Sequence, residues 1–202
     1  RSARRGSAVS AGAAADLATA QRLNLPARYV LALGAHDPRK NLGVLLEALV
    51  RLPDLTLVVA GPVGSGDLAR QSRRLGVADR VRMAGYVSAD ERSSLYQSAV
   101  AFAYPSVYEG FGLPVLEAMA CGTPVVASSA SSVPEVAADA ALTADPYDVN
   151  AWVGSLRAAV DDRAVRARLI ERGRQRAAAF TWERTAIQTM HLLQCAAQHR
   201  QS

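Results

Sequence analysis

Short apolar runs alternate along the chain with segments in which apolar residues recur every three or four positions. An apolar run of about four to eight residues is typical of a strand buried on both faces, and the recurring pattern is typical of a helix with one buried face. We expect strands at residues 29–34, 55–61, 80–85, 100–104, 124–127 and 141–143. We expect helices at residues 41–52, 67–75, 88–98, 112–120, 149–161, 163–179 and 182–198.

The alternation of strands with helices predicts the fold class. It favours an α/β fold with a doubly wound, Rossmann-like parallel sheet that helices cover on both faces. The 202 residues suffice for one such domain, so we divide the chain into a poorly ordered leader or linker (1–24), the α/β domain (25–180) and a C-terminal helix (181–202). Ligands of such a sheet bind beyond the carboxyl ends of its strands.

Composition excludes several classes of function. The net charge is +5, but the basic residues are not interleaved with aromatic ones, so we expect no nucleic-acid partner. The two cysteines, Cys121 and Cys195, lie far apart, which favours free thiols in a reducing, cytoplasmic compartment over a disulfide or a zinc site. No run of about 18 apolar residues is present, so the sequence predicts no membrane span.

Several familiar motifs are absent from the sequence. A P-loop needs Gly-Lys-Ser/Thr, but the sole lysine, Lys40, follows Arg39. A dinucleotide fingerprint needs three glycines directly after the first strand, where Gly34 stands alone. The sequence also lacks a Gly-x-Ser-x-Gly elbow and an Asp-x-Asp pair for a metal-bridged diphosphate.

Residues 105–124 carry the most informative pattern. After the fourth predicted strand, Glu109 lies in a loop whose glycines, Gly110 and Gly112, allow backbone amides to approach a ligand closely. The helix that follows begins near Leu113, and its start favours an anion such as a diphosphate. Glu117 lies on the early turns of that helix, eight positions after Glu109. Two carboxylates placed on either side of a diphosphate can each hold a pair of hydroxyls.

This stretch resembles the E-x7-E signature of the large retaining glycosyltransferase family 4. The loop at residues 34–42, which contains Lys40, and the segments 120–127 and 132–136 also resemble that family. The resemblance implies that the chain is the C-terminal, donor-binding domain of an enzyme with the two-domain GT-B fold. It implies a retaining transfer of a hexose from a GDP- or UDP-linked sugar, with no cofactor and no metal required.

The resemblance also implies roles for individual residues. Lys40 and Glu109 are the expected catalytic residues: Lys40 neutralises the diphosphate leaving group and Glu109 contacts the transferred sugar. Lys40 is also lysine in a chain whose other basic residues are all arginine, which favours a specific role. Glu117 is expected to bind the ribose hydroxyls. The other expected donor-binding residues are Arg39, Gly34, Gly110, Phe111, Gly112, Leu113, Tyr86 and Val87.

One departure from the family pattern bears on the donor. Many members carry Gly-Arg where this chain has Gly34-Ala35, and the small residue resembles a subgroup of mannosyltransferases that use GDP-mannose. The alternative interpretation is that the missing arginine leaves Lys40 and Arg39 with more of the phosphate contact. We interpret the neighbouring His36 as a loop residue and not as a catalytic one.

Alternatives stay open for the role of the chain as a whole and for that of its last helix. We expect the acceptor, a glycan or a lipid-linked molecule, to bind an N-terminal domain outside this chain, so the chain alone is a binding module without activity of its own. A sugar-nucleotide epimerase-like relative is a further alternative. The helix at 182–198 is amphipathic and is expected to pack on the partner domain or cap the sheet, with peripheral contact to the inner face of the membrane as the alternative.

Overall fold

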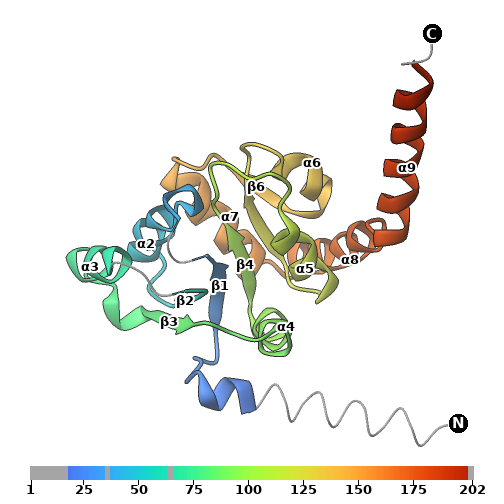
Figure 1. The fold of residues 1–202 in the computed structure, drawn as a ribbon. Helices are drawn as coiled ribbons and strands as arrows, with labels where there is room; N and C mark the ends of the chain where they lie inside the picture. The colour runs from blue at the N-terminus through green and yellow to red at the C-terminus, as the bar shows by residue number, and fades with distance from the viewer. Residues whose placement is uncertain (1–17, 35–36, 63–65, 200–202) are drawn as a thin grey trace, which may run out of the picture.

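The computed structural model describes residues 18–34, 37–62 and 66–199, and within these residues six parallel strands form one sheet (Figure 1). The strands are β1 (Tyr29–Leu33), β2 (Thr56–Ala60), β3 (Val81–Gly85), β4 (Ala101–Tyr104), β5 (Val125–Ser128) and β6 (Leu142–Ala144). Their order in the sheet is β3-β2-β1-β4-β5-β6. The chain therefore adds strands outward from β1 in one direction and then, from β4 onward, in the other. The point between β1 and β4 is where such sheets bind ligands.

Helices cover both faces of this sheet, which confirms the predicted fold class. They are α2 (Gly43–Val50), α3 (Asp67–Arg74), α4 (Ala89–Ser98), α5 (Leu113–Ala120), α6 (Val133–Ala137), α7 (Val149–Asp161), α8 (Arg163–Ala178) and α9 (Trp182–His199). The short 3-10 turns are η1 (Pro38–Lys40), η2 (Ala78–Arg80) and η3 (Ala138–Ala140). One core cluster lies between the sheet and α2 and α7, and the other lies between the sheet and α4, α5 and α6.

The central strand β1 contributes to both clusters. Val30 and Ala32 belong to the first cluster, and Tyr29 and Leu31 belong to the second. Successive side chains of a strand point to opposite faces, so a strand covered on both sides is apolar at every position. This explains why the strands appear in the sequence as unbroken apolar runs.

The differences from the expected elements are small and have local causes. The sequence did not predict α6, because a helix of five residues is too short to show a helical period. The expected helix at 41–52 is shorter, because Asn41 has a left-handed backbone (φ 49°) and ends η1 before α2 begins. The expected helix at 88–98 begins with a capping box: the Ser88 hydroxyl accepts from the Glu91 amide, and the Glu91 carboxylate accepts from the Ser88 amide.

The expected leader, residues 1–24, falls partly outside the described residues, which begin at residue 18. Residues 18–22 are helical, and Leu23 packs with Leu25 against the second core cluster. Arg22 forms an ion pair of 2.5 Å with Glu91 at the start of α4. The described part of this segment therefore packs on the α/β domain.

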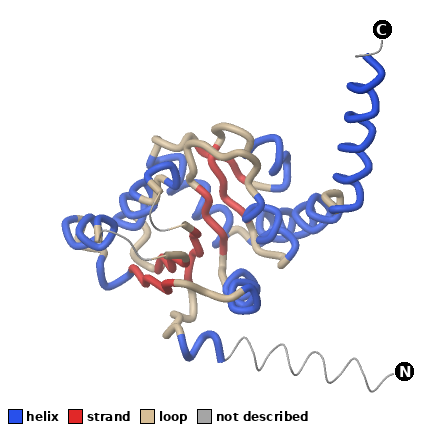
Figure 2. Tube along the Cα trace, in the orientation of Figure 1, coloured by secondary structure: helices blue, strands red, loops and turns tan. Residues whose placement is uncertain are grey.

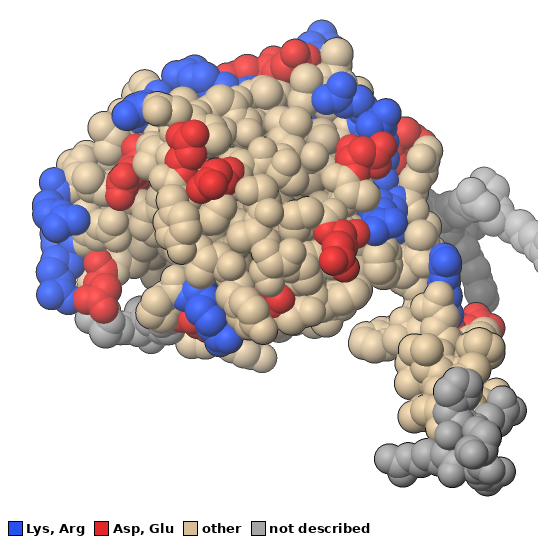
Figure 3. Space-filling model, turned by 90° about the horizontal axis from the view of Figure 1, so that it is seen from above, with Lys and Arg blue, Asp and Glu red and all other residues tan. Residues whose placement is uncertain are grey.

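The last helix, α9, projects away from the rest of the molecule (Figures 1 and 2). All of its side chains that the structure describes are exposed. The large apolar ones are Trp182, Ile187, Met190, Leu192 and Leu193. No helix among the described residues is both long and apolar enough to cross a membrane. On the face seen from above the view of Figure 1, basic and acidic side chains are interspersed (Figure 3).

The junction between α7 and α8 yields a test of the fold. The Asp162 carboxylate accepts hydrogen bonds from the amides of Ala164 (2.8 Å) and Val165 (3.0 Å) at the start of α8, which packs on α5. We expect Asp162→Ala to lower the free energy of unfolding by about 1 kcal/mol, because the first amides of α8 lose their acceptor. Urea denaturation measures the loss. Asp162→Asn keeps an acceptor and should stay close to wild type, and equal losses in both variants would contradict the capping role.

Candidate functional site

The loop that follows β1 is fastened to two other loops at the carboxyl ends of the strands. The side-chain amide of Asn41 donates to the carbonyl oxygens of Pro105 (3.3 Å), after β4, and Pro146 (2.6 Å), after β6. The amide of Val107 donates to the carbonyl of Arg39 at 2.8 Å. These contacts fix the residues after β1 against those after β4, at the point where the strand order reverses.

Gly34 makes room for the side chain of Lys40. Its backbone is left-handed (φ +91°), and a Cβ at this position would lie 3.0 Å from Cγ and Cε of Lys40. Its amide donates to the carbonyl of Ala60 at 2.9 Å, so this N–H group already belongs to the sheet. The contact of Gly34 with the donor stays a prediction. In the structure the missing side chain of Gly34 leaves room for the Lys40 stem.

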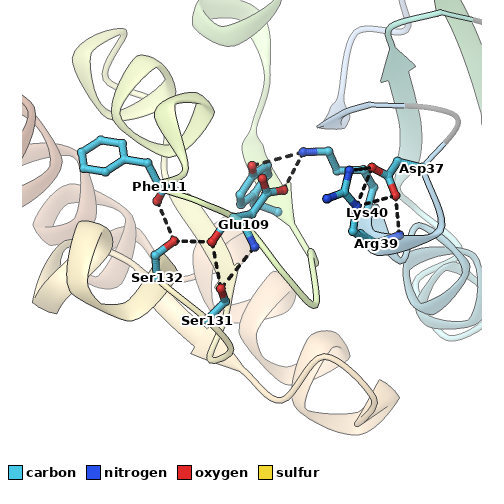
Figure 4. Close-up of polar contacts among 8 residues, drawn as sticks. Asp37, Arg39, Lys40, Glu109, Phe111, Ser131 and Ser132 are labelled. Carbon is cyan, nitrogen blue, oxygen red and sulfur yellow. Dashed lines mark hydrogen bonds and ion pairs between the residues drawn. The ribbon is translucent and has the colours of Figure 1, made fainter.

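Lys40 and Glu109 form an ion pair at this point (Figure 4). Nζ of Lys40 lies 2.5 Å from Oε1 of Glu109 and 3.4 Å from the hydroxyl of Tyr104, the last residue of β4. The two charged side chains are 22% and 16% exposed, so the pair is only partly accessible to water. Such a pair is held more strongly than one on an open surface.

The surroundings set the pKa of Glu109. Partial burial raises it, but the hydrogen bond from Lys40 lowers it, and the pKa lies below its usual value. Burial raises the pKa of Tyr104, and the neighbouring Glu109 carboxylate raises it further. At neutral pH Glu109 is therefore a carboxylate and Tyr104 a neutral phenol.

The loop after β5 fixes the backbone at Glu109 (Figure 4). The Ser131 hydroxyl accepts from the Glu109 amide at 3.2 Å and donates to the Glu109 carbonyl at 2.9 Å. The Ser132 hydroxyl lies 3.0 Å from the same carbonyl and 3.1 Å from that of Phe111. Neither serine is among the site residues that the sequence predicts. A polar stretch directly after a buried strand at the ligand-binding edge is the sequence signal that could have identified them.

The turn into α5 contains one glycine with a left-handed backbone. Gly112 has φ +107° and precedes the first residue of α5, and no side chain caps the helix there. The side chain of Phe111 points away from Glu109 (Figure 4), and its ring packs edge-on against that of Phe180. Leu113 is half exposed. The roles of Gly110, Gly112 and Leu113 as donor contacts stay predictions.

Glu117 lies on α5 and faces α4. Its carboxylate accepts from the Tyr96 hydroxyl at 3.1 Å and forms an ion pair of 3.1 Å with Arg92. The charges of both Glu109 and Glu117 contribute to the raised pKa of Tyr104. The expected contact of Glu117 with the ribose hydroxyls stays a prediction.

For Arg39, Tyr86 and Val87, the remaining expected donor contacts, the structure gives the surroundings, and their contact with the donor stays a prediction. Arg39 is paired with Asp37, and this pairing lowers the pKa of Asp37 to about 2. Hydrogen bonding to Asp37, and then the charge of Asp37, raise the pKa of Arg39. Tyr86 is 81% exposed at the end of β3, and Val87 packs against the second core cluster.

Ala35 and His36 lie outside the described residues, so the expectations about them stay predictions. Within the parts of the chain that the structure covers, no three His, Cys, Asp or Glu side chains are grouped so as to hold a metal ion.

Comparison with known proteins decides the family. The model of the family described as glycosyl transferases group 1 matches residues 16–176, which is more than half of the chain. The chain belongs to this family. It is 41% identical over 170 residues to the O-antigen chain mannosyltransferase B of Escherichia coli, an alignment that covers 81% of this chain and 45% of that protein. It is 36% identical over 207 residues to a D-inositol 3-phosphate glycosyltransferase of Salinispora tropica, covering 93% of this chain and 43% of that protein.

Solved structures agree with this family assignment. The fold matches a sucrose-phosphate synthase from Thermosynechococcus elongatus with a TM-score of 0.78 and 30% identity, over 90% of this chain and 49% of that one. It also matches the Anabaena protein Alr3699/HepE, solved with UDP and glucose, with a TM-score of 0.79 and 23% identity, over 90% of this chain and 52% of that one. The described domain thus has the fold of one half of a GT-B glycosyltransferase. It spans less than half the length of the two curated relatives it matches.

The packing of Lys40 on Gly34 can be tested by adding a methyl group. We expect Gly34→Ala to weaken the binding of a nucleoside diphosphate at least about tenfold, because the new Cβ displaces the Lys40 stem and the electrostatic contact is lost. Calorimetric titration with GDP and UDP measures the affinity.

The control for this variant is Gly76→Ala. Gly76 also has a positive φ (+70°), but a Cβ there would meet nothing within 4 Å. The control should lose a little stability, because its backbone is strained, and keep its affinity. Equal affinities for Gly34→Ala and Gly76→Ala would show that Gly34 does not position Lys40.

Proposed function

We propose that this chain binds the nucleotide-sugar donor of a retaining hexosyltransferase, with Lys40 on the diphosphate and Glu109 on the transferred sugar. The observation that carries the proposal is the Lys40–Glu109 ion pair at the point where the strand order reverses. Ligands of doubly wound sheets bind at this edge, and the pair offers a cation for a diphosphate and a carboxylate for hydroxyls at one place.

Electrostatic stabilisation of the leaving group is the main contribution expected of the protein. As the bond between the anomeric carbon and the diphosphate breaks, negative charge grows on the phosphate oxygens. A fixed ammonium in a partly buried site stabilises that charge more than water does, because little reorganisation is needed. In this proposal Lys40 and the first amides of α5 serve this role. The departing phosphate accepts the proton of the acceptor on the same face of the sugar, and no metal is required.

Two observations favour mannose as the transferred sugar and GDP-mannose as the donor. The relative from Escherichia coli, 41% identical, is a mannosyltransferase. Ala35 stands where many family members have arginine, as in mannosyltransferases that use GDP-mannose. A UDP-linked hexose is the competing donor. In either case Glu117 holds the ribose, and the loop at Tyr86 and Val87 borders the base.

The acceptor belongs, in this proposal, to a part of the protein outside this chain. The chain spans less than half of the relatives it matches, and a transferase needs a second surface to position a glycan or lipid-linked acceptor and to exclude water. We therefore propose that this chain alone binds the donor without transferring the sugar. The exposed α9 is available for contact with such a partner domain or with the cytoplasmic face of a membrane.

A screen of nucleotides tests donor binding directly. We expect GDP to raise the melting temperature of the chain more than UDP, ADP or dTDP, because a ligand that binds only the folded state stabilises it, by about 2.7 kcal/mol at a hundredfold excess over Kd. The shift should be the same with EDTA as with magnesium. Stabilisation by none of the four nucleotides would refute donor binding, and a shift that needs magnesium would refute the metal-independent site.

Turnover by the full-length enzyme tests the two assigned catalytic roles. We expect Lys40→Ala and Glu109→Ala each to lower kcat at least about 100-fold, the scale of losing one preorganised electrostatic contact. Asp139→Ala is the matched control, because it removes an exposed ion pair between Asp139 on η3 and Arg172 on α8. Near-normal turnover by either site variant would contradict its role.

A further inference from the structure

Tyr104 is a buried residue whose hydroxyl reaches the ion pair of the site. The side chain is 1% exposed, and its ring stacks on that of Phe102 with centroids 5.8 Å apart. Its hydroxyl lies 3.4 Å from Nζ of Lys40, which itself lies 2.5 Å from Oε1 of Glu109. A rigid phenol at the end of β4 therefore lies beside both charged groups.

Binding of a diphosphate at Lys40 creates a difficulty for Glu109. In the structure Lys40 is within 2.5 Å of the Glu109 carboxylate, so a diphosphate has to share or take this cation. A carboxylate that is only 16% exposed then has a weaker counter-charge and acquires an anionic neighbour. Both changes penalise the ionised carboxylate unless another donor satisfies it.

The Tyr104 hydroxyl is placed to be that donor. Burial and the neighbouring carboxylates raise the pKa of Tyr104, so the phenol keeps its proton and can donate a hydrogen bond to Glu109. Unlike the Lys40 ammonium, which is carried on a flexible stem, the phenol is fixed by the strand and by its stacking on Phe102. It can therefore stay with Glu109 when Lys40 turns to the phosphate.

We infer that Tyr104 is a positioning residue that holds the Glu109 carboxylate in place when a diphosphate draws Lys40 away from it. The inference rests on the proposed function, because it requires that a nucleotide sugar binds at Lys40. It adds to that function a specific division of labour. Lys40 exchanges its partner during binding, whereas Tyr104 keeps the carboxylate ready to accept the sugar hydroxyls.

Proton uptake on binding separates this role from a merely structural one. When Lys40 leaves Glu109, the pKa of the carboxyl rises, so binding takes up protons as the pH falls, and the Tyr104 hydroxyl limits that rise. Among the described residues, the other charged groups that act on these residues are Asp37 and Arg39, from the loop after β1, and Glu117, from α5. None of the three is altered in the variants below.

The experiment is calorimetric titration of the chain with GDP-mannose and with UDP-glucose between about pH 5 and 8, in two buffers of different ionisation enthalpy. Nucleotide sugars suit this purpose because both of their phosphates are diesters without a proton to exchange in that range. The variants are Tyr104→Phe and Glu109→Gln. Tyr29→Phe is the matched control, since Tyr29 is also 1% exposed and its hydroxyl donates to a backbone carbonyl, that of Leu95.

We expect Tyr104→Phe to bind the nucleotide sugar about tenfold more weakly at pH 7, the scale of losing one hydrogen bond to a charged group. Its proton uptake should be larger than that of wild type and begin at a higher pH. Glu109→Gln should lose the uptake assigned to this carboxyl, and Tyr29→Phe should match wild type.

Each other outcome counts against a specific claim. If wild type binds neither sugar nucleotide, the proposed function fails and the role of Tyr104 fails with it. If wild type binds but Tyr104→Phe has the affinity and proton uptake of wild type, only the role of Tyr104 fails. If Tyr104→Phe loses affinity with unchanged uptake, its contribution is structural and the inference is wrong.

Discussion

A lysine and a glutamate 69 residues apart in the chain form the contact on which the proposed chemistry depends. Partial burial of two charged groups costs free energy, because they lose contact with water. Only a backbone that holds the two opposite charges at short range offsets this cost. The sheet supplies that backbone. Lys40 follows β1 and Glu109 follows β4, and these strands are neighbours only because the order of the sheet reverses between them.

The loops that carry this pair are held by polar contacts made at the ends of the strands. Asn41 binds carbonyls after β4 and β6, and Ser131 binds the backbone of Glu109 from the loop after β5. Four strand ends thus fix one pair of side chains. Such a supporting layer limits the freedom of groups that must meet a transition state in a defined geometry. The apolar clusters on both faces of the sheet hold the strands themselves in register.

The sequence predicts the strands and the loop that carries Glu109, but it does not predict which distant side chains meet there. Continuous apolar runs predicted the strands, and the spacing of Glu109 and Glu117 with the glycines between them predicted the loop and helix after β4. Contacts across the fold were not predictable in this way. That Asn41 meets Pro146, or that Glu117 binds Arg92 and Tyr96, depends on packing between distant segments. The sequence places Tyr104 only at the end of an apolar strand. A tyrosine at a strand end has the same sequence pattern whether or not its hydroxyl contacts a charged group.

The most direct test of the central claim is a crystal structure of this chain with GDP-mannose or UDP-glucose bound. The account predicts that the diphosphate lies within hydrogen-bonding distance of Nζ of Lys40, that the Lys40–Glu109 contact lengthens beyond 2.5 Å, and that the hexose lies against Glu109. A nucleotide sugar bound away from the ends of β1 and β4, with the ion pair intact, would contradict it.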